Sequence, residues 1–231
     1  MLVSKSIVLS LSTRLNSNDL DSWSTLTEEL GLERLMLYDA AKRAIDLTTA
    51  ALLLLFLSPL LMLVALLVRV SSTGPVIFAQ ERLTKGGKRF TLYKFRTMQV
   101  DAEKDTGAVW AQRSDPRVTA LGRLLRLSRL DELPQLLNVV IGDMSLIGPR
   151  PERPEFTAEL SEHIPGFHRR LEVKAGITGL AQVVSGYSAS TRSYKRKVAL
   201  DLIYIRRRSL ILDLKIALRT IGVMLTGFGA H

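Results

Sequence analysis

One apolar stretch limits the folds open to this chain, because no charged residue occurs between Leu47 and Val68. As an α-helix, this stretch would span the roughly 30 Å hydrocarbon core of a bilayer. On length alone it therefore predicts a single transmembrane helix. Ser58-Pro59 lies in its middle, however, and a proline removes a backbone donor and clashes with the preceding turn. Positive residues flank both ends, so they favour neither orientation in the membrane: Lys42 and Arg43 before it, Arg69, Arg82 and Lys85 after it.

A helix broken at Ser58-Pro59, which enters the membrane and returns to the same face, satisfies both observations. The Ser58 hydroxyl would then bond a carbonyl group freed at the break, as kinks buried in membranes require. We therefore expect three segments along the chain: an N-terminal appendage at 1–38, a re-entrant membrane helix at 39–72, and a domain with membrane-surface helices at 73–231.

The charge of the chain indicates an anionic partner. Its 231 residues carry 32 Lys and Arg against 22 Asp and Glu, a formal net charge of +10. Such an excess is typical of proteins that bind nucleic acid, an acidic membrane surface or phosphorylated substrates. The absence of cysteine excludes disulfides and thiolate metal sites. Three histidines, His163, His168 and His231, argue against a histidine-built zinc site.

Outside the apolar stretch, the pattern predicts mainly helical structure with one small β-hairpin. Two strands at 76–79 and 89–95 are joined by a turn at 85–88. A glycine-bearing turn is expected at 174–182. Helices are expected at 26–38, 118–130, 194–204 and 210–218. The last of these follows three arginines and is amphipathic, which suits the surface of an anionic membrane as well as an ordinary packed position.

Two adjacent carboxylates, Asp131 and Glu132, stand out in so basic a chain. Ser128 and Asp131 have the spacing of a capping box, in which the acid only ties down a helix start. Pro134 argues against this role, because it would lie well inside such a helix and break a hydrogen bond there. A new helix is instead expected to begin near residues 130–133. Both carboxylates would then lie at its N-terminus, where free N–H groups attract anions such as phosphate.

Several basic residues are candidate phosphate contacts, and each has a plainer alternative. Lys94 and Arg96 would share one face of a strand, which is most simply a solvated face. Arg123 and Arg126 form a basic stripe that leads towards the carboxylate pair, although such stripes are more often solvent-exposed faces than binding sites. Arg150 lies between two prolines, which hold its backbone extended and suit a fixed guanidinium that binds phosphate. A rigid turn that merely contains arginine explains this last pattern equally well.

Seven short motifs follow one another along the chain: Lys42-Arg43-x-x-Asp46, Ser58-Pro59, Tyr93-Lys94-Phe95-Arg96-Thr97-Met98, Ser128-x-x-Asp131-Glu132-Leu133-Pro134-Gln135-Leu136-x-Asn138, Gly142-Asp143-Met144-Ser145-x-x-Gly148-Pro149-Arg150-Pro151, Gly176-Ile177-Thr178-Gly179-x-Ala181-Gln182-Val183 and Leu200-Asp201-x-x-Tyr204. Together they resemble the bacterial sugar transferases, also called monotopic phosphoglycosyl transferases. The resemblance covers residues 38–218, and seven motifs in register are far more specific than any one of them.

The resemblance implies transfer of a sugar-1-phosphate from a UDP-sugar to polyprenol (undecaprenyl) phosphate, with release of UMP. This would be the first membrane step in the synthesis of a glycoconjugate. It also implies a re-entrant helix broken at Ser58 and Pro59 in the bacterial inner membrane, with a compact catalytic domain on the cytoplasmic face. Anionic membrane lipid is an expected partner and nucleic acid is not, while a homo-oligomer is possible. The sugar and the polymer pathway are left open.

The resemblance also assigns roles to individual residues. Asp131 would attack the β-phosphorus and hold the phosphosugar, and Glu132 would help to place Mg²⁺ or the aspartate. Mg²⁺ would be shared by these two carboxylates and the substrate phosphates. The residues expected to bind substrate are Lys94, Arg126, Arg150 and Asp201. The composition agrees, because phosphoryl transfer needs positioning and charge neutralisation more than proton movement. An aspartate is a known type of phosphoryl acceptor, and Mg²⁺ prefers one or two carboxylates plus phosphates.

The chain departs from the family pattern at two places. Ala175 replaces the usual proline, which should loosen the following loop slightly. Ser185-Gly186-Tyr187 stands where the family often has Asn-Gly-Arg, so one expected phosphate or sugar contact is missing and Tyr187 suggests a different sugar preference. The rival hypothesis is a membrane-anchored basic adaptor that binds anionic lipid or nucleic acid. It gives no role to the carboxylate pair or to Arg150 between prolines.

Overall fold

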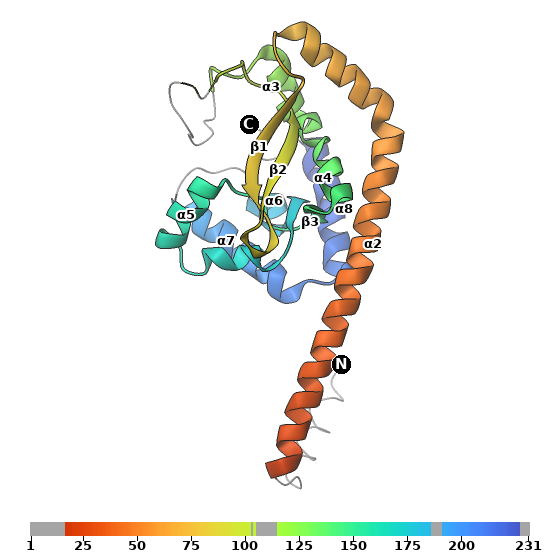
Figure 1. Cartoon of the computed structure of the whole chain (residues 1–231), viewed down its shortest axis with the longest axis vertical. Helices are drawn as coiled ribbons and strands as arrows, with labels where there is room; N and C mark the ends of the chain where they lie inside the picture. Colours follow the sequence, from red (N-terminus) through yellow and green to blue (C-terminus); the bar gives the residue numbers. More distant parts are fainter. Residues whose placement is uncertain (1–16, 103, 105–114, 186–190, 227–231) are drawn as a thin grey trace. The chain divides into compact units, whose positions relative to one another are not determined.

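The computed structural model describes residues 17–102, 104, 115–185 and 191–226 (Figure 1). The chain divides into two compact units, Met1–Lys42 and Arg43–His231. Helix α2 (Ser17–Ser71) begins in the first unit and ends in the second. The described part of the first unit consists of the N-terminal residues of α2. The short separate helix expected at 26–38 is therefore wrong, because these residues belong to one long helix.

Helix α2 continues through Pro59 without interruption. The helix does not end at the expected break, Ser58-Pro59, and Figure 1 shows the α2 ribbon changing direction in its light-orange upper part. A proline inside a helix removes one hydrogen bond and bends the axis, yet the flanking turns keep their own bonds. The Ser58 hydroxyl donates to the carbonyl oxygen of Leu55 at 2.8 Å. This bond supplies part of the hydrogen bonding that the proline removes.

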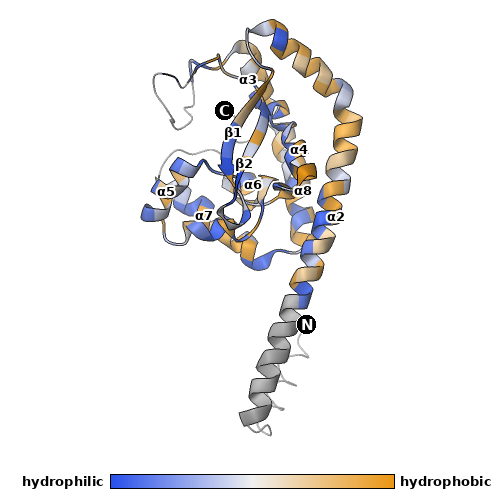
Figure 2. Ribbon diagram, viewed as in Figure 1, coloured by the Kyte–Doolittle hydropathy of each residue, from blue (hydrophilic) through white to orange (hydrophobic). Residues whose placement is uncertain are grey.

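The apolar part of α2 is the one helix in the described chain that is long and apolar enough to cross a membrane, by length and composition. It lies within Glu33–Ser71, and Figure 2 shows it as a largely orange ribbon. Large apolar side chains on it are exposed, such as Phe56 at 74% and Val70 at 78%. Their exposure fits a hydrocarbon surrounding better than water, because contiguous exposed apolar surface is uncommon in soluble proteins.

The hairpin consists of β1 (Ile77–Leu83) and β2 (Arg89–Phe95), which pair antiparallel with Leu83 opposite Arg89. A short 3-10 turn, η1 (Lys85–Gly87), joins them and places Gly86 and Gly87 at positive φ, as the expected glycine-containing turn requires. Alternate residues of β2 are buried: Phe90 and Leu92 pack with residues of α2 and of helix α4 (Gln135–Ile141) in one core cluster. The predicted hairpin is confirmed, although β1 extends further than 76–79.

A second, parallel pair of strands was not predicted. Strand β3 (Met144–Ile147) pairs with β4 (Ala175–Thr178). The segment expected to be a glycine-bearing turn at 174–182 therefore begins with a strand. Its glycines allow a close backbone approach, because a Cβ atom on Gly176 would collide with the backbone of Gly148. A hydrogen bond from Gly148 N to Thr178 O, at 2.9 Å, helps to hold the two strands together.

Helices make up most of the remaining chain, so the expectation of a mainly helical fold with small strands is confirmed. Thr119 caps the first of them by accepting a hydrogen bond from Gly122 N at 2.9 Å. The elements are α3 (Ala120–Leu127), η2 (Leu130–Glu132), α4 (Gln135–Ile141), α5 (Pro154–His163), η3 (Phe167–Glu172), α6 (Leu180–Ser185), α7 (Thr191–Arg207) and α8 (Leu210–Thr226). Tyr204 of α7 and Ile216 of α8 pack with Ile147 of β3 in the C-terminal core.

Within the second unit, charged side chains fasten α2 to the other elements. Arg43 donates to two carbonyl oxygens in the last turn of α4, at 2.6 and 3.0 Å. Asp46 accepts a hydrogen bond from Ser145 Oγ of β3 at 2.7 Å. At the other end, the Arg96 guanidinium donates to the carbonyl oxygens of Ser72 and Thr73, at 2.8 and 2.7 Å. A cation at a helix C-terminus is favourable, since the last carbonyl groups have no partner inside the helix.

Candidate active site

The carboxylate pair lies where the chain turns from one helix into the next. The Ser128 hydroxyl donates to Leu124 O at 2.9 Å and so caps the end of α3, which excludes the capping-box alternative. Arg129 follows in the left-handed region, with φ of 59°, and breaks the helix. A new helical turn, η2, then begins at Leu130, as predicted, and contains both carboxylates. Asp131 and Glu132 are buried.

Glu132 is held by two cations. Its Oε1 atom accepts hydrogen bonds from Lys94 Nζ at 3.0 Å and from Arg150 Nη2 at 2.6 Å. Burial alone would raise the pKa of Glu132, but the Arg150 guanidinium and the Lys94 ammonium hold this pKa far below its usual range. Glu132 is therefore ionised, and it fixes the positions of the two basic side chains. Charge-assisted hydrogen bonds of this kind are among the stronger polar contacts in proteins.

Asp131 differs from its neighbour, because the described part of the chain offers its carboxylate no hydrogen-bond donor. Burial is the main cause that raises the pKa of Asp131, with the Glu132 charge acting in the same direction. Lys94, Arg150 and Arg126 oppose this shift by their positive charges. The result is a carboxylate within the field of three cations whose oxygens are not used in holding the fold. Such a group can bond to phosphorus or to a metal ion.

The structure brings most, though not all, of the expected basic residues together. Lys94 lies on β2 at Glu132, and burial lowers its pKa. Arg126 of α3 donates from Nε to Thr97 Oγ1 at 2.9 Å. Arg96 was expected to share a solvated strand face with Lys94, and the solvated position is wrong for Arg96. Arg96 follows the last residue of β2, is buried, and caps the end of α2.

Asp201 lies apart from the cluster around Glu132. It is buried on α7, where its Oδ2 atom accepts a hydrogen bond from Arg170 Nε at 2.7 Å. Arg170, in η3, was not singled out from the sequence. One signal did exist, since a lone acid among apolar residues requires a cationic partner when it is buried. The sequence offers many arginines, however, and no local spacing selects one that lies on a different element. Tyr187, the other candidate specificity residue, lies outside the described residues.

Asp131 and Glu132 fit a Mg²⁺ ion only if substrate phosphates and water supply most of its ligands. In the described ranges, no three side chains of His, Cys, Asp or Glu are grouped as a metal site. Mg²⁺ does not need such a cage, because it usually takes one or two carboxylates and completes its coordination with substrate phosphates and water. Asp131 has carboxylate oxygens to offer, whereas Oε1 of Glu132 is already occupied by Lys94 and Arg150. The donor set is therefore centred on Asp131.

Comparison with known proteins gives a consistent result. Residues 37–227 match the model of the family described as bacterial sugar transferase. The chain is 45% identical over 195 residues to the UDP-N-acetylgalactosamine-undecaprenyl-phosphate N-acetylgalactosaminephosphotransferase of Aeromonas hydrophila, which covers 84% of this chain and 46% of that protein. It is 44% identical over 195 residues to the UDP-glucose:undecaprenyl-phosphate glucose-1-phosphate transferase of Caulobacter vibrioides, which covers 84% of this chain and 73% of that protein.

A protein of Escherichia coli with the same name as the Caulobacter one is 42% identical over 209 residues, which cover 86% of this chain and 45% of the relative. The chain thus spans about half the length of some relatives and three quarters of another. The family match covers most of the described chain and includes the candidate site. The chain belongs to the bacterial sugar transferase family.

Proposed function

We propose that this protein transfers a sugar-1-phosphate from a UDP-sugar to polyprenol phosphate and releases UMP. The observation that carries the proposal is the unequal use of the carboxylate pair. Glu132 is committed to Lys94 and Arg150, while Asp131 keeps its oxygens available beside the same cations. The names of the relatives, which are undecaprenyl-phosphate sugar phosphotransferases, agree with this chemistry.

The reaction would proceed in two displacements at one phosphorus atom. An Asp131 oxygen forms a bond to the β-phosphorus of the UDP-sugar, and the bond from that phosphorus to the bridging oxygen of UMP breaks. UMP leaves with the electron pair as an anion. A phosphate oxygen of polyprenol phosphate then bonds to the same phosphorus, and the aspartyl oxygen leaves. Polyprenol phosphate attacks as an anion and UMP leaves as one, so histidine is dispensable as a general acid or base.

The basic side chains would bind the pyrophosphate and offset the charge that develops on it. Lys94 of β2, Arg126 of α3 and Arg150 of the segment between β3 and α5 all act on the charge of Asp131. Donors fixed in advance at a developing charge lower the barrier without reorganisation during the reaction. A Mg²⁺ ion held by Asp131, with Glu132 beside it, would supply further neutralisation of the phosphate charge. Asp201 would contribute to substrate binding indirectly, since its carboxylate is engaged by Arg170.

The membrane arrangement is part of the proposal. The bend of α2 at Ser58-Pro59 supports a re-entrant helix in the bacterial inner membrane, with the catalytic domain on the cytoplasmic face. Helix α8 supports contact with anionic lipid at the membrane surface, because Ile211, Leu214 and Leu218 are exposed beside three preceding arginines. The reaction would then begin assembly of a glycoconjugate at the membrane.

The Asp131→Asn variant tests the assignment of the nucleophile. With UDP-sugar and no acceptor, the wild-type protein should release about one UMP per molecule and retain labelled sugar phosphate through denaturation. Asp131→Asn should do neither, and it should still be extracted from membranes in folded form. Glu159→Gln, which changes an exposed carboxylate on α5, is the matched control and should behave as wild type. Near-normal UMP release by Asp131→Asn would exclude an aspartyl intermediate.

A labelling experiment tests the topology. Since the chain has no cysteine, Glu33→Cys and Lys85→Cys each introduce a single thiol at an exposed position. If α2 is re-entrant, an impermeant thiol reagent should label both variants from the same side of sealed vesicles. Labelling from opposite sides would show that α2 crosses the bilayer.

A further inference from the structure

The segment Pro149–Glu152, here called the Pro-Arg-Pro segment, is fixed by hydrogen bonds to each of its four carbonyl groups. The donors come from separate parts of the second unit. Pro149 O accepts from Gly176 N at 2.9 Å, and Glu152 O accepts from Leu83 N at 3.2 Å. The other two donors are arginine side chains: Arg170 Nη2 reaches Arg150 O at 2.8 Å, and Arg82 Nη1 reaches Pro151 O at 3.4 Å. A loop held in this way loses little freedom on binding a substrate.

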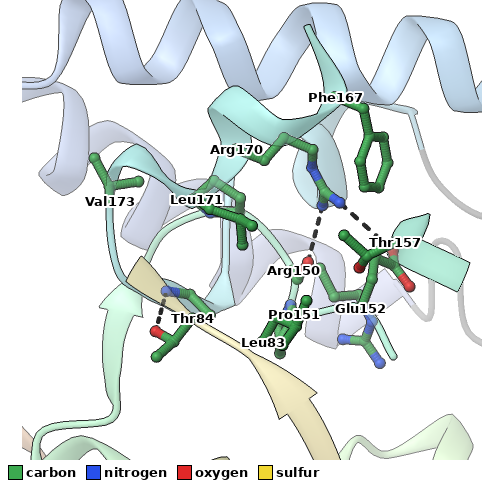
Figure 3. Close-up of a pocket in the computed structure, with 12 residues that line it drawn as sticks. Leu83, Thr84, Arg150, Pro151, Glu152, Thr157, Phe167, Arg170, Leu171 and Val173 are labelled. Carbon is green, nitrogen blue, oxygen red and sulfur yellow. Dashed lines mark hydrogen bonds and ion pairs between the residues drawn. The ribbon is translucent and has the colours of Figure 1, made fainter. Parts of the chain in front are cut away.

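Arg170 differs from the other donors because its charged side chain is buried and contacts several partners. Its side chain is buried, with its guanidinium 4.9 Å from the centre of the Phe167 ring. One edge of the guanidinium donates to Asp201. Another edge donates to Arg150 O, while Nη1 lies 4.0 Å from Glu152 Oε1 (Figure 3). A buried charge is tolerated only when it is paired and hydrogen-bonded. The Asp201 carboxylate therefore holds Arg170, and Arg170 holds the backbone of Arg150.

We propose that Arg170, held by Asp201, is a positioning residue that acts on the reaction through Arg150. This inference rests on the proposed function. Arg150 is fixed at two points: its carbonyl oxygen by Arg170 and its guanidinium by Glu132. Two fixed points define where the remaining N–H groups of the Arg150 side chain are directed. Asp201 then contributes through this chain of contacts rather than by touching the substrate.

Lysine cannot take over this task, even though it keeps the positive charge. The guanidinium of Arg170 donates in two directions within one plane, from Nε to Asp201 and from Nη2 to Arg150 O. An ammonium is a single point of charge on a flexible stem, so it can stay paired with Asp201 and lose the bond to Arg150 O. Arg170→Lys is therefore expected to fold, while it loosens the Pro-Arg-Pro segment. A displaced reactive group commonly lowers turnover by large factors.

The experiment compares four proteins by steady-state UMP release: wild type, Arg170→Lys, Arg150→Lys and the double variant. Arg170→Lys should lower kcat about 10- to 100-fold, the usual range for residues that orient a functional group. The KM for UDP-sugar should change less than about threefold, because Lys94 and the other donor contacts are unchanged. The double variant should be no slower than Arg150→Lys alone, since Arg170 has nothing left to position. Arg169→Lys, an exposed neighbour paired with Glu172, is the matched control and should behave as wild type.

The outcomes separate the two proposals. If the losses in the single variants multiply in the double variant, or if Arg170→Lys equals wild type, Arg170 does not act through Arg150. Should Arg170→Lys fail to fold, Asp201→Asn takes its place, because it keeps an acceptor for Arg170 Nε, and the same comparison with Arg150→Lys applies. If instead the wild-type protein releases no UMP from any UDP-sugar, the proposed function fails and the positioning inference fails with it.

Discussion

The strongest test of the site as a folded unit is the Glu132→Gln variant. An amide keeps the shape of the side chain but removes the charge that holds Lys94 and Arg150. Removing one partner of a buried ion pair costs about 3–5 kcal/mol, because the other charge remains buried without compensation. The side chains of Glu132 and Lys94 are 11% and 19% exposed, so this cost applies at the lysine end. Arg150 is 39% exposed and can turn to water, so its bond counts for much less.

We therefore expect Glu132→Gln to destabilise the protein by about 3 kcal/mol, the lower end of that range. For a unit of this size, each kcal/mol shifts Tm by about 2–4 °C, so Tm should fall by about 6–12 °C. The assay is thermal unfolding of detergent-solubilised protein, with Glu159→Gln as the matched control. Lys94→Met in the Glu132→Gln background should cost less than Lys94→Met alone, because the two residues are coupled. A Tm within 2 °C of wild type would refute the reasoning, since Glu132 would then carry no structural charge pair.

Three further predictions follow from other parts of the structure. The pKa of Glu132 is lower in the folded than in the unfolded chain, so the ionised carboxylate stabilises the fold above about pH 4.3, and this stabilisation is lost progressively as the pH falls below that value. The Tm difference between wild type and Glu132→Gln should therefore shrink in acid. Gly74→Ala should destabilise the protein by about 2 kcal/mol or more in denaturant titrations, because φ at Gly74 is +114° and the new Cβ would meet the Arg96 guanidinium. Gly222→Ala is the control and should be nearly neutral, because the space around Gly222 is open. Chelation with EDTA should abolish UMP release and leave Tm nearly unchanged, whereas an unchanged rate would exclude a role for Mg²⁺.

What could be predicted from the sequence depended on how local the cause was. The β2 strand, the helical turn that begins at Leu130 and the rejection of a capping box all follow from alternation or from a nearby proline. The pairing of β3 with β4 could not be predicted, because both strands are short and their partners lie far apart in sequence. In the sequence, the one sign of this pairing was Gly176, and a turn explains a glycine there equally well.

The candidate site shows the same division. Asp131, Glu132, Lys94 and Arg150 were selected from motifs, and the structure brings the last three into contact. Glu132 accepts hydrogen bonds from two cations, whereas the described residues donate none to Asp131. This difference depends on side-chain geometry in three dimensions, so a sequence cannot distinguish the two acids. Arg170 was missed for a related reason: its partners are a backbone carbonyl and an acid on another helix, and a carbonyl group leaves no mark in a sequence.

The clamping of α2 has a mechanical consequence. On one side of the apolar residues, its own Arg43 and Asp46 bind α4 and β3, and on the other side Arg96 binds the backbone just after its end. A helix held at two separated points cannot pivot freely against the body that holds it. Arg96 also lies only two residues from Lys94 along the chain. A force that tilts the helix would therefore act through Arg96 on Lys94, whose ammonium contacts Glu132 in the candidate site.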